Sequence, residues 1–231
     1  MINYRGLNIP RVSFGSVSSD DLFGPLDQGV FDFYEANANR YRRALDIGAN
    51  IGVHSIIMAR QGWQVMAFEP DPTHYGKITE NIDLNIGEND WDMQILRGAV
   101  SNHKGHETFV RVNGNTTGSH LKGDKKPYGD LEEFTVEVLD CRPLFAWADF
   151  AKVDCEGHEA KLLRTVKSGS KCEFMVEVSN KKTAKAIFDH FHGWRKMWAQ
   201  RHEWGEVTTP FGMPMHHSDG HLFIGNAPPF P

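Results

Sequence analysis

Glycine and acidic residues are grouped in a short turn, DIGANIG, that begins at Asp46 and ends at Gly52. Gly48 and Gly52 allow the chain to turn sharply and to approach a ligand closely. A turn of this kind between a strand and a helix is typical of proteins that bind nucleotide-like ligands. The spacing Gly-x-x-x-Gly, with Asn50 in the middle, matches neither the G-x-G-x-x-G turn of dinucleotide binders nor the G-x-x-x-x-G-K-[ST] loop of nucleoside triphosphatases. The turn therefore disfavours a ligand that is held by its phosphates.

Two acids accompany this turn in a way that favours a positively charged ligand. A carboxylate at Asp46 would repel a pyrophosphate but would attract the amino group and the sulfonium of S-adenosylmethionine. Glu69 ends the next apolar run, in AFEP, where a carboxylate can accept hydrogen bonds from both hydroxyls of a ribose. NAD-binding proteins share that acid, and either acid alone could be a turn cap or a solvated loop residue. Together, around the glycine turn, they predict a site for S-adenosylmethionine.

A second group of ionisable residues lies in AKVDCEGHEAKLL, between Ala151 and Leu163. Methyl transfer to a hydroxyl requires the oxygen to lie in line with the methyl group, and a base, either a histidine or a carboxylate of raised pKa, to take the proton. His158 is predicted as the base because of its intrinsic pKa, and Asp154 and Glu156 as catalytic groups that orient the acceptor. Capping of the following helix is the alternative for these residues, since acids favour helix N-termini.

Composition narrows the class of protein. The chain has 231 residues, of which 40% are hydrophobic and 24% charged, as is ordinary for a globular protein. The formal net charge of -5 provides no positive field for nucleic acid, so we expect no nucleic-acid partner. The three cysteines have no CxxC spacing, which disfavours a disulfide framework or a structural zinc site and suits a reducing compartment.

The apolar runs of the chain are short. None has the character of a signal peptide or the length of a membrane span. We therefore expect a cytoplasmic protein without a membrane partner. The oligomeric state is left open, with a homo-oligomer compatible with the sequence.

The elements that must position these residues alternate between strands and helices, which is typical of a doubly wound, mostly parallel α/β sheet. The predicted core strands occupy residues 43–48, 63–70, 93–100, 149–157 and 172–180. Two β-forming runs, 106–113 and 133–140, predict a β-hairpin insertion between the third and fourth core strands. The runs at 194–205 and 221–228 have no helical pattern between them, so one of these last two strands is predicted to be antiparallel.

These elements predict a single domain for residues 1–231. Residues 1–42 form an N-terminal cap in this interpretation, and residues 43–180 form the cofactor-binding core. Residues 181–231 contribute the C-terminal helix and the last two strands.

The two clusters, with the segments between them, resemble the FkbM-like family of S-adenosylmethionine-dependent methyltransferases. The similar segments are LDIGANIGVHS, AFEPDPTHYGKITENIDLN, GAVSN, AKVDCEGHEAKLL and MVEVSN, from about Ala44 to Asn180. The resemblance implies the class I methyltransferase fold, a seven-stranded Rossmann-like sheet whose last strand is antiparallel. It also implies O-methylation of a hydroxyl on a saccharide or other small molecule.

The resemblance also assigns roles to residues by their position. The implied cofactor-binding residues are Asp46, Gly48, Asn50 and Gly52 in the turn, Glu69 at the ribose, and Ala99 and Val100 near the adenine. The chain departs from the family pattern at Cys155, where an aliphatic residue is usual, and at Asn102, where an aspartate is frequent. The resemblance ends before Lys181, so it implies no acceptor contacts in the C-terminal region.

A long polar loop, GNTTGSHLKGDKKPYGD, separates the two runs of the predicted insertion. It is either a lid over the acceptor, with Thr117, Ser119 and His120 facing the site, or a solvated hairpin loop.

A histidine-rich segment, MPMHHSDGH, precedes the last predicted strand. Its competent metal ligands are His216, His217, Asp219 and His221. Their spacing matches no helix-borne metal motif, and short loops collect such residues readily. We therefore assign no metal site.

The predicted function is S-adenosylmethionine-dependent O-methyltransferase. One alternative is an NAD-dependent oxidoreductase, which the missing third glycine and Asp46 disfavour. The other is a non-enzymatic binding module with a methyltransferase fold. The pair Asp46 and Glu69 disfavours that alternative, because a scaffold need not keep acids that bind a ligand.

Overall fold

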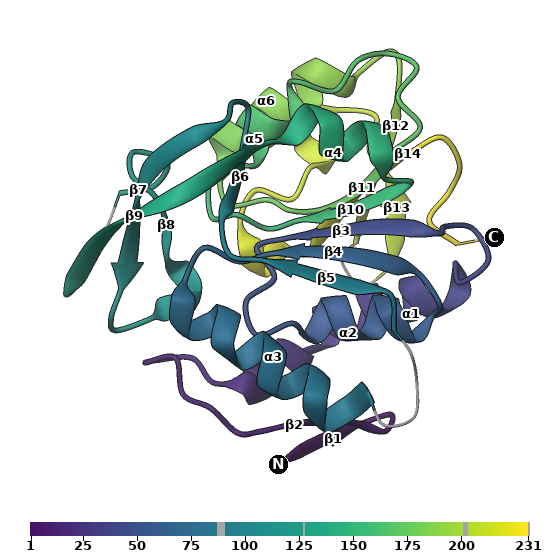
Figure 1. Cartoon of the computed structure of the whole chain (residues 1–231). Coiled ribbons are helices and arrows are strands. Elements are labelled where there is room, and N and C mark those ends of the chain that lie inside the picture. Colours follow the sequence, from purple (N-terminus) through teal and green to yellow (C-terminus); the bar gives the residue numbers. More distant parts are fainter. Residues whose placement is uncertain (87–90, 127, 201–202, 231) are drawn as a thin grey trace.

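In the part of the chain that the structure describes, the main sheet has eight strands. Figure 1 shows their arrangement. A computed structural model of the chain describes residues 1–86, 91–126, 128–200 and 203–230. In spatial order the strands are β13 (Trp204–Glu206), β12 (Lys196–Gln200), β14 (His221–Gly225), β11 (Glu173–Glu177), β10 (Phe150–Val153), β3 (Arg43–Ile47), β4 (Gln64–Phe68) and β5 (Met93–Leu96). The sequence predicts seven strands, and β13 at the edge is the additional one.

The strands at the centre of this sheet are parallel. β5, β4, β3, β10 and β11 pair in parallel, whereas β14 runs antiparallel to both β11 and β12. The prediction that the last strand is antiparallel is therefore confirmed. Parallel neighbours need a crossover, and helices supply it here.

Helices cover both faces of the sheet (Figure 1). On one face lie α4 (Cys141–Trp147), α5 (Glu159–Leu163) and α6 (Lys181–Phe191), and on the other lie α1 (Pro25–Ala36), α2 (Val53–Arg60) and α3 (Pro72–Ile86). Successive strand residues face opposite layers, so Leu45 packs with the first group and Ala44 with the second. Coverage on both faces explains the continuous apolar runs from which the strands are predicted.

The third predicted strand, 93–100, is broken in the structure. Its first part is β5, and its second part is β6 (Ala99–Ser101), which belongs to a separate sheet. Gly98 lies at the break, where a Cβ atom would come 3.1 Å from the Glu137 carbonyl oxygen. A side chain at this residue would therefore be tightly packed against β9.

The insertion is larger than the predicted hairpin. It forms a four-stranded sheet in the order β6-β9-β7-β8. Besides β6, its strands are β7 (Gly105–Val112), β8 (His120–Leu121) and β9 (Leu131–Asp140). β7 and β9 pair antiparallel, and β6 pairs in parallel with β9. The insertion thus starts within the third predicted strand.

The N-terminal strands pack against α3, at the bottom of Figure 1. β1 (Ile2–Tyr4) and β2 (Leu7–Ile9) form an antiparallel pair, followed by a short 3-10 helix, Ser19–Phe23. Further 3-10 turns lie at Thr116–Gly118, Pro210–Gly212 and His217–Asp219. Among the described residues, no helix has the length and the apolar composition that crossing a bilayer requires.

Candidate functional site

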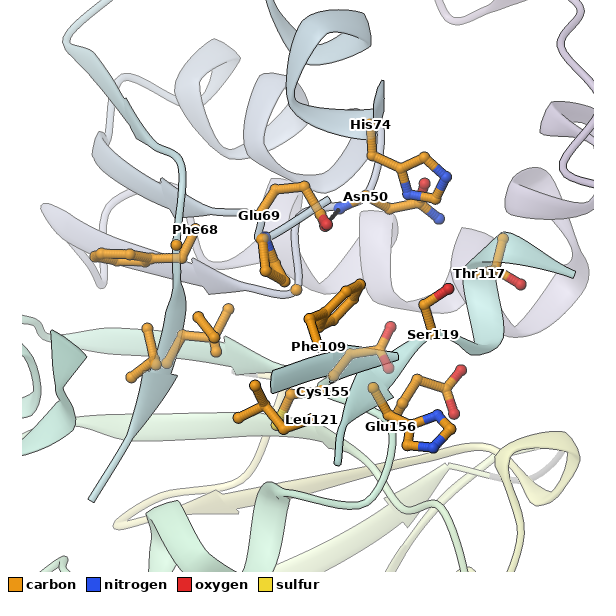
Figure 2. Close-up of a pocket in the computed structure, with 18 of the residues that line it drawn as sticks. Asn50, Phe68, Glu69, His74, Phe109, Thr117, Ser119, Leu121, Cys155 and Glu156 are labelled. Carbon is orange, nitrogen blue, oxygen red and sulfur yellow. Dashed lines mark hydrogen bonds between the residues drawn. The ribbon is translucent and has the colours of Figure 1, made fainter. Parts of the chain in front are cut away.

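A cavity lies at the carboxyl ends of β3, β4 and β10, beside the insertion sheet (Figure 2). This first cavity encloses about 620 Å³, with its open mouth included. Its walls are formed by the glycine turn after β3, the Glu69 segment after β4, β6, the insertion, and the turn after β10. The lining residues are Ile47, Gly48, Asn50, Phe68, Glu69, Pro70, His74, Gly98, Ala99, Val100, Phe109, Thr116, Thr117, Ser119, His120, Leu121, Asp154, Cys155 and Glu156.

The glycine turn is pressed against the turn after β10. Gly48 has a φ of 81°, and a Cβ atom there would lie 1.8 Å from the Asp154 carbonyl oxygen. Gly52 has a φ of 84°, and a Cβ atom there would lie 2.9 Å from Ile78 Cγ2. At both positions glycine is favoured by the positive φ and also by the lack of space for a Cβ atom. Gly48 lines the cavity, whereas Gly52 lies behind the turn and packs against α3.

Glu69 is a buried carboxylate in the wall of the first cavity. Its Oε2 atom accepts a hydrogen bond of 2.8 Å from the Asn50 backbone N–H, and its Oε1 atom accepts one of 2.8 Å from the Asp71 backbone N–H. Burial raises the pKa of Glu69 to about 8, although these two bonds oppose the shift. Figure 2 shows Glu69 and Asn50 on one side of the cavity. The carboxylate oxygens retain lone pairs with which to accept hydrogen bonds from a ligand.

Asp46 lies beneath the glycine turn and does not line the first cavity. It is fully buried, accepts a hydrogen bond of 2.5 Å from the Ser55 hydroxyl, and lies 3.7 Å from Lys152 Nζ. Burial alone would lower the pKa of Lys152, but the carboxylates of Asp154 and Asp46 outweigh it and raise that pKa. The direct contact with a ligand that the sequence predicts for Asp46 is therefore not part of this arrangement.

The apolar wall of the first cavity includes residues that the sequence does not single out. Ala99 and Val100 of β6 line it as predicted, and Phe68, Phe109 and Leu121 extend the same wall. Phe109 and Leu121 belong to β7 and β8 of the insertion sheet, so the insertion supplies this part of the wall (Figure 2). A flat, apolar wall of this kind suits an aromatic base.

The insertion loop forms part of the cavity rather than a solvated hairpin. Thr117, Ser119 and His120 all line the first cavity, whereas a lid over the acceptor stays a prediction. His120 and Ser119 are buried, and Ser119 Oγ accepts a hydrogen bond of 3.1 Å from the Val112 backbone N–H. These contacts fix the loop against β7.

The turn after β10 carries the three predicted catalytic residues, but only two of them reach the first cavity. Asp154 and Glu156 line the first cavity, but His158 does not. His158 is fully buried, with Nε2 2.8 Å from Ser101 Oγ and Nδ1 2.6 Å from Asp124 Oδ2. Because both ring nitrogens are engaged away from the cavity, this geometry does not fit the predicted role of general base. His158 instead ties the turn to β6 and to the insertion loop.

Glu159 also shapes this turn. Its Oε1 atom accepts hydrogen bonds from the backbone N–H groups of Gly157, at 2.9 Å, and Cys155, at 3.2 Å. Burial raises the pKa of Glu159 to about 7. Glu156 has a φ of 53°, so the turn holds a non-glycine residue in the left-handed region. Glu159 thus holds the turn that precedes α5, and α5 itself has no side-chain cap, while Glu156 lines the cavity.

A second cavity adjoins the first. The two share Asn50, Thr117, Asp154 and Glu156. The second cavity is also lined by the N-terminal segment, the insertion and the C-terminal segment, through Val17, Asp21, Leu22, Gly24, Pro25, Leu26, Asp27, Asn115, Gly118, Lys125, Tyr128, Glu177, His217, Ser218 and His221. Its walls thus come from parts of the chain that lie far apart in the sequence.

The four candidate metal ligands of the tail do not converge. His216 is exposed and its Nδ1 contacts the Ser218 hydroxyl at 2.9 Å, whereas His221 is buried and its Nδ1 contacts Gln200 Oε1 at 3.1 Å. The Asp219 carboxylate accepts a hydrogen bond from the Met215 backbone N–H. In the described parts of the chain, no three His, Cys, Asp or Glu residues are placed to hold a metal ion.

The sequence matches a known family model and is similar to a curated protein. The model of the Methyltransferase FkbM domain matches residues 46–205. Hexuronic acid methyltransferase AglP of Haloferax volcanii is 30% identical over 122 residues, which are 52% of this chain and 47% of that protein. The chain thus spans about half the length of the curated relative that it matches.

Solved structures show a weaker similarity. A putative O-methyltransferase from Klebsiella pneumoniae aligns with a TM-score of 0.47 at 12% identity, over 87% of this chain and 80% of that one. The O-methyltransferase from Bacillus cereus aligns with a TM-score of 0.45 at 14% identity, over 89% and 85%. The assignment of the family therefore rests on the sequence match.

Proposed function

The chain belongs to the FkbM methyltransferase family, and from this premise we propose that it transfers a methyl group from S-adenosylmethionine to a hydroxyl of a saccharide or other small molecule. Membership of the family favours methyl transfer over the hydride transfer of an oxidoreductase. The name of the relative from Haloferax volcanii, a hexuronic acid methyltransferase, supports a saccharide as the acceptor.

The observation that carries this proposal is the pairing of Glu69 with Asn50 opposite an apolar wall. Two ribose hydroxyls would donate to the Glu69 carboxylate, whose geometry is fixed by two backbone N–H groups. An adenine ring would lie against Ala99, Val100 and Phe109. The Asn50 Oδ1 atom is buried and has no hydrogen-bond partner among the described residues. Buried polar atoms are normally paired, so this atom fits a site that a ligand completes.

The charges around the first cavity also fit the proposed cofactor. S-adenosylmethionine supplies a methyl group on a positively charged sulfonium. Asp46 below the turn and Asp154 in the wall provide negative charge beside it, and no phosphate has to be held. Lys152 forms ion pairs with both acids and so balances part of their negative charge.

The acceptor would approach from the second cavity. The residues shared by the two cavities, Asn50, Thr117, Asp154 and Glu156, mark the place where a hydroxyl could reach the methyl group. Asp154 and Glu156 are proposed to orient acceptor hydroxyls there, as expected from the sequence. Holding the oxygen in line at near-attack distance is the main contribution required of the protein.

Transfer of a labelled methyl group tests this proposal. The protein is incubated with S-adenosylmethionine carrying a deuterated methyl group and with a panel of neutral, acidic and amino sugars, with and without a chelator, and products are read by mass spectrometry. We expect one labelled methyl ether in at least one class of sugar. Transfer to amines alone would contradict O-methylation. Failure to bind S-adenosylhomocysteine would contradict the cofactor.

A further inference from the structure

His221 is a buried histidine in the wall of the second cavity. It is the first residue of β14, is 4% exposed and lines that cavity. Its Nε2 atom is buried and has no hydrogen-bond partner within the described chain. Glu177 Oε2 lies 3.9 Å from Nε2, which is too far for a hydrogen bond. A buried polar atom of this kind calls for a partner that enters the cavity.

The hydrogen-bond network fixes which nitrogen of His221 carries the proton. Gln200 Nε2 donates a hydrogen bond of 3.1 Å to the Leu26 carbonyl, so its Oε1 atom is free to accept. His221 Nδ1 lies 3.1 Å from that Oε1 and must therefore be the donor. The lone pair of the neutral imidazole is then on Nε2, the nitrogen that has no partner among the described residues.

Two glycines make this arrangement sterically possible. A Cβ atom on Gly29 of α1 would lie 2.0 Å from Gln200 Nε2. A Cβ atom on Gly220, whose φ is 110°, would lie 1.9 Å from the Gln200 carbonyl oxygen. Gly29 therefore makes room for the Gln200 side chain and Gly220 for the Gln200 backbone, so that Gln200 can lie beside His221.

The surroundings of His221 keep the ring neutral and can stabilise it once it is protonated. Burial lowers the pKa of His221 to about 4. The charged and titratable groups that face it are Asp27 of α1, His54 of α2, Lys152 of β10, Asp154 of the following turn and Glu177 of β11. The positive groups lower its pKa further, whereas the Asp27 and Asp154 carboxylates raise it. A proton on Nε2 would thus be held among carboxylates.

We infer that the second cavity is the acceptor site, that it takes an uncharged polyhydroxylated ligand, and that His221 Nε2 accepts the proton of the hydroxyl that is methylated. This inference rests on the proposed function. As the acceptor oxygen forms its bond to the methyl carbon, the bond between that carbon and sulfur breaks, and its electron pair stays on sulfur as a neutral thioether. The hydroxyl proton moves to Nε2 and from there to solvent. This role replaces the one that the sequence predicts for His158.

The charge of the second cavity selects the class of acceptor. Its acidic lining residues are Asp21, Asp27, Asp154, Glu156 and Glu177. Its one lysine in the described lining, Lys125, is already paired with Glu156 at 2.5 Å. Burial, and then the charge of Asp154, raise the pKa of both Glu156 and Glu177. A uronate would add another carboxylate to this set and be repelled, whereas the hydroxyls of a neutral sugar would donate to it.

Nuclear magnetic resonance tests the state of His221 without any acceptor. The full chain is labelled with ¹⁵N-histidine, bound to S-adenosylhomocysteine and observed between pH 4 and 8, with His221→Gln used to assign the signal. We expect the Nδ1–H tautomer, neutral across pH 6 to 8. An Nε2–H tautomer, or a ring that is charged at pH 7, would overturn the inference.

Methyl transfer tests the role and the class of acceptor. The probes are methyl glucoside, which is neutral, and methyl glucuronide, which is anionic, and the matched control is His216→Gln in the neighbouring exposed turn. We expect transfer to methyl glucoside to fall by roughly 100-fold or more in His221→Gln, and to be unchanged in His216→Gln. Both variants should bind S-adenosylhomocysteine as the wild type does. Faster transfer to methyl glucuronide than to methyl glucoside, or full transfer in His221→Gln with cofactor bound, would overturn the inference and leave the proposed function intact.

A second variant covers the case in which His221→Gln does not fold. Gln200 is a positioning residue, and Gln200→Glu keeps an acceptor opposite Nδ1 while adding negative charge. The pKa of His221 should rise, and the acidic limb of the pH profile of transfer should move upward with it. An unchanged profile alongside a raised pKa would contradict the role of His221.

Discussion

The two cavities of this protein are built in different ways. The first is formed mainly by turns that follow successive strands of a parallel sheet, where the carboxyl ends of β3, β4 and β10 meet. The second collects Asp27 from the start of α1, Lys125 from the insertion and His221 from β14. Sequence motifs can report a site of the first kind, because each turn carries its own pattern. A site of the second kind exists only after distant segments pack together.

The largest effect is expected from Gly48→Ala, which tests how tightly the first cavity is built. The new Cβ atom would lie 1.8 Å from the Asp154 carbonyl oxygen, at a positive φ. We expect the free energy of unfolding to fall by roughly 3 to 5 kcal/mol, with loss of cofactor binding, as measured by urea denaturation and calorimetry.

Gly62→Ala is the matched control for that variant. Gly62 also has a positive φ, 82°, but a Cβ atom there would have no neighbour within 4 Å. The free energy of unfolding of Gly62→Ala should fall by only about 1 kcal/mol. Equal losses in the two variants would show that backbone conformation alone, and not the packing of the two turns, accounts for Gly48.

Replacement of His158 tests whether this residue has a structural role, holding the turn after β10 against β6 and the insertion loop. His158→Asn would leave Ser101 and Asp124 without their shared partner. We expect a loss of roughly 2 to 3 kcal/mol in the free energy of unfolding, and an unchanged pH profile for the transfer that remains. If His158→Asn keeps the stability of the wild type but loses methyl transfer with a changed pH profile, His158 would be the general base after all.

Replacement of Glu69 tests the cofactor contact of the first cavity. Glu69→Gln retains the size of the side chain but offers one acceptor atom fewer. The dissociation constant for S-adenosylhomocysteine should rise by roughly 10-fold to 100-fold, measured by calorimetry. Affinity equal to that of the wild type would mean that the ribose does not bind there.

The pH dependence of the first cavity should show two opposite trends. Because burial raises the pKa of Glu69 to about 8, its contribution to stability is fully present below about pH 4.5 and is lost as the pH rises through 8. Ribose hydroxyls favour the ionised carboxylate, so cofactor affinity should increase from pH 6 to 8, by less than 10-fold per pH unit.

Glu69→Gln should abolish the trend in affinity but only part of the trend in stability. Glu159, with a pKa raised by burial to about 7, contributes to stability in the same direction and does not line the first cavity. Melting temperatures and titrations at several pH values measure both trends. A wild-type affinity that falls from pH 6 to 8 would contradict the proposed contact.

The smallest effect is expected in the second cavity, from Tyr128→Phe. The Tyr128 hydroxyl accepts a hydrogen bond of 3.2 Å from Asn115 Nδ2 at the rim of that cavity. Stability should change by less than about 0.5 kcal/mol, and cofactor affinity should not change. The KM for the acceptor should rise by roughly 3-fold to 10-fold. A change in cofactor affinity instead would mean that the two cavities are not separate sites.

The sequence predicts the first cavity well because its signals are local. Gly48, Asn50, Glu69, Ala99, Val100, Asp154 and Glu156 all line it. Asp46 and Gly52 belong to the same turn but support it from behind. The parallel core strands and the antiparallel last strand follow from apolar runs and from the helices, or their absence, between them.

The sequence cannot show where side chains of separate segments meet. His158 and His221 have the same intrinsic pKa, and only the packing of the insertion closes off both nitrogens of the former. From the sequence, His221 is only a weak candidate for a metal ligand. No pattern near it indicates that Gln200 and Asp27 are its neighbours in space. The close approach of β9 to Gly98 is likewise reported by no local pattern.

The central claim is that the first cavity holds S-adenosylmethionine through Glu69. Calorimetric titration of the wild-type protein with S-adenosylhomocysteine at pH 7, repeated in two buffers of different ionisation enthalpy, tests it most directly. We predict binding at one site with release of a fraction of a proton to the buffer, and no binding of NADH. Binding of NADH in place of S-adenosylhomocysteine, or binding of the latter without proton release, would contradict the account.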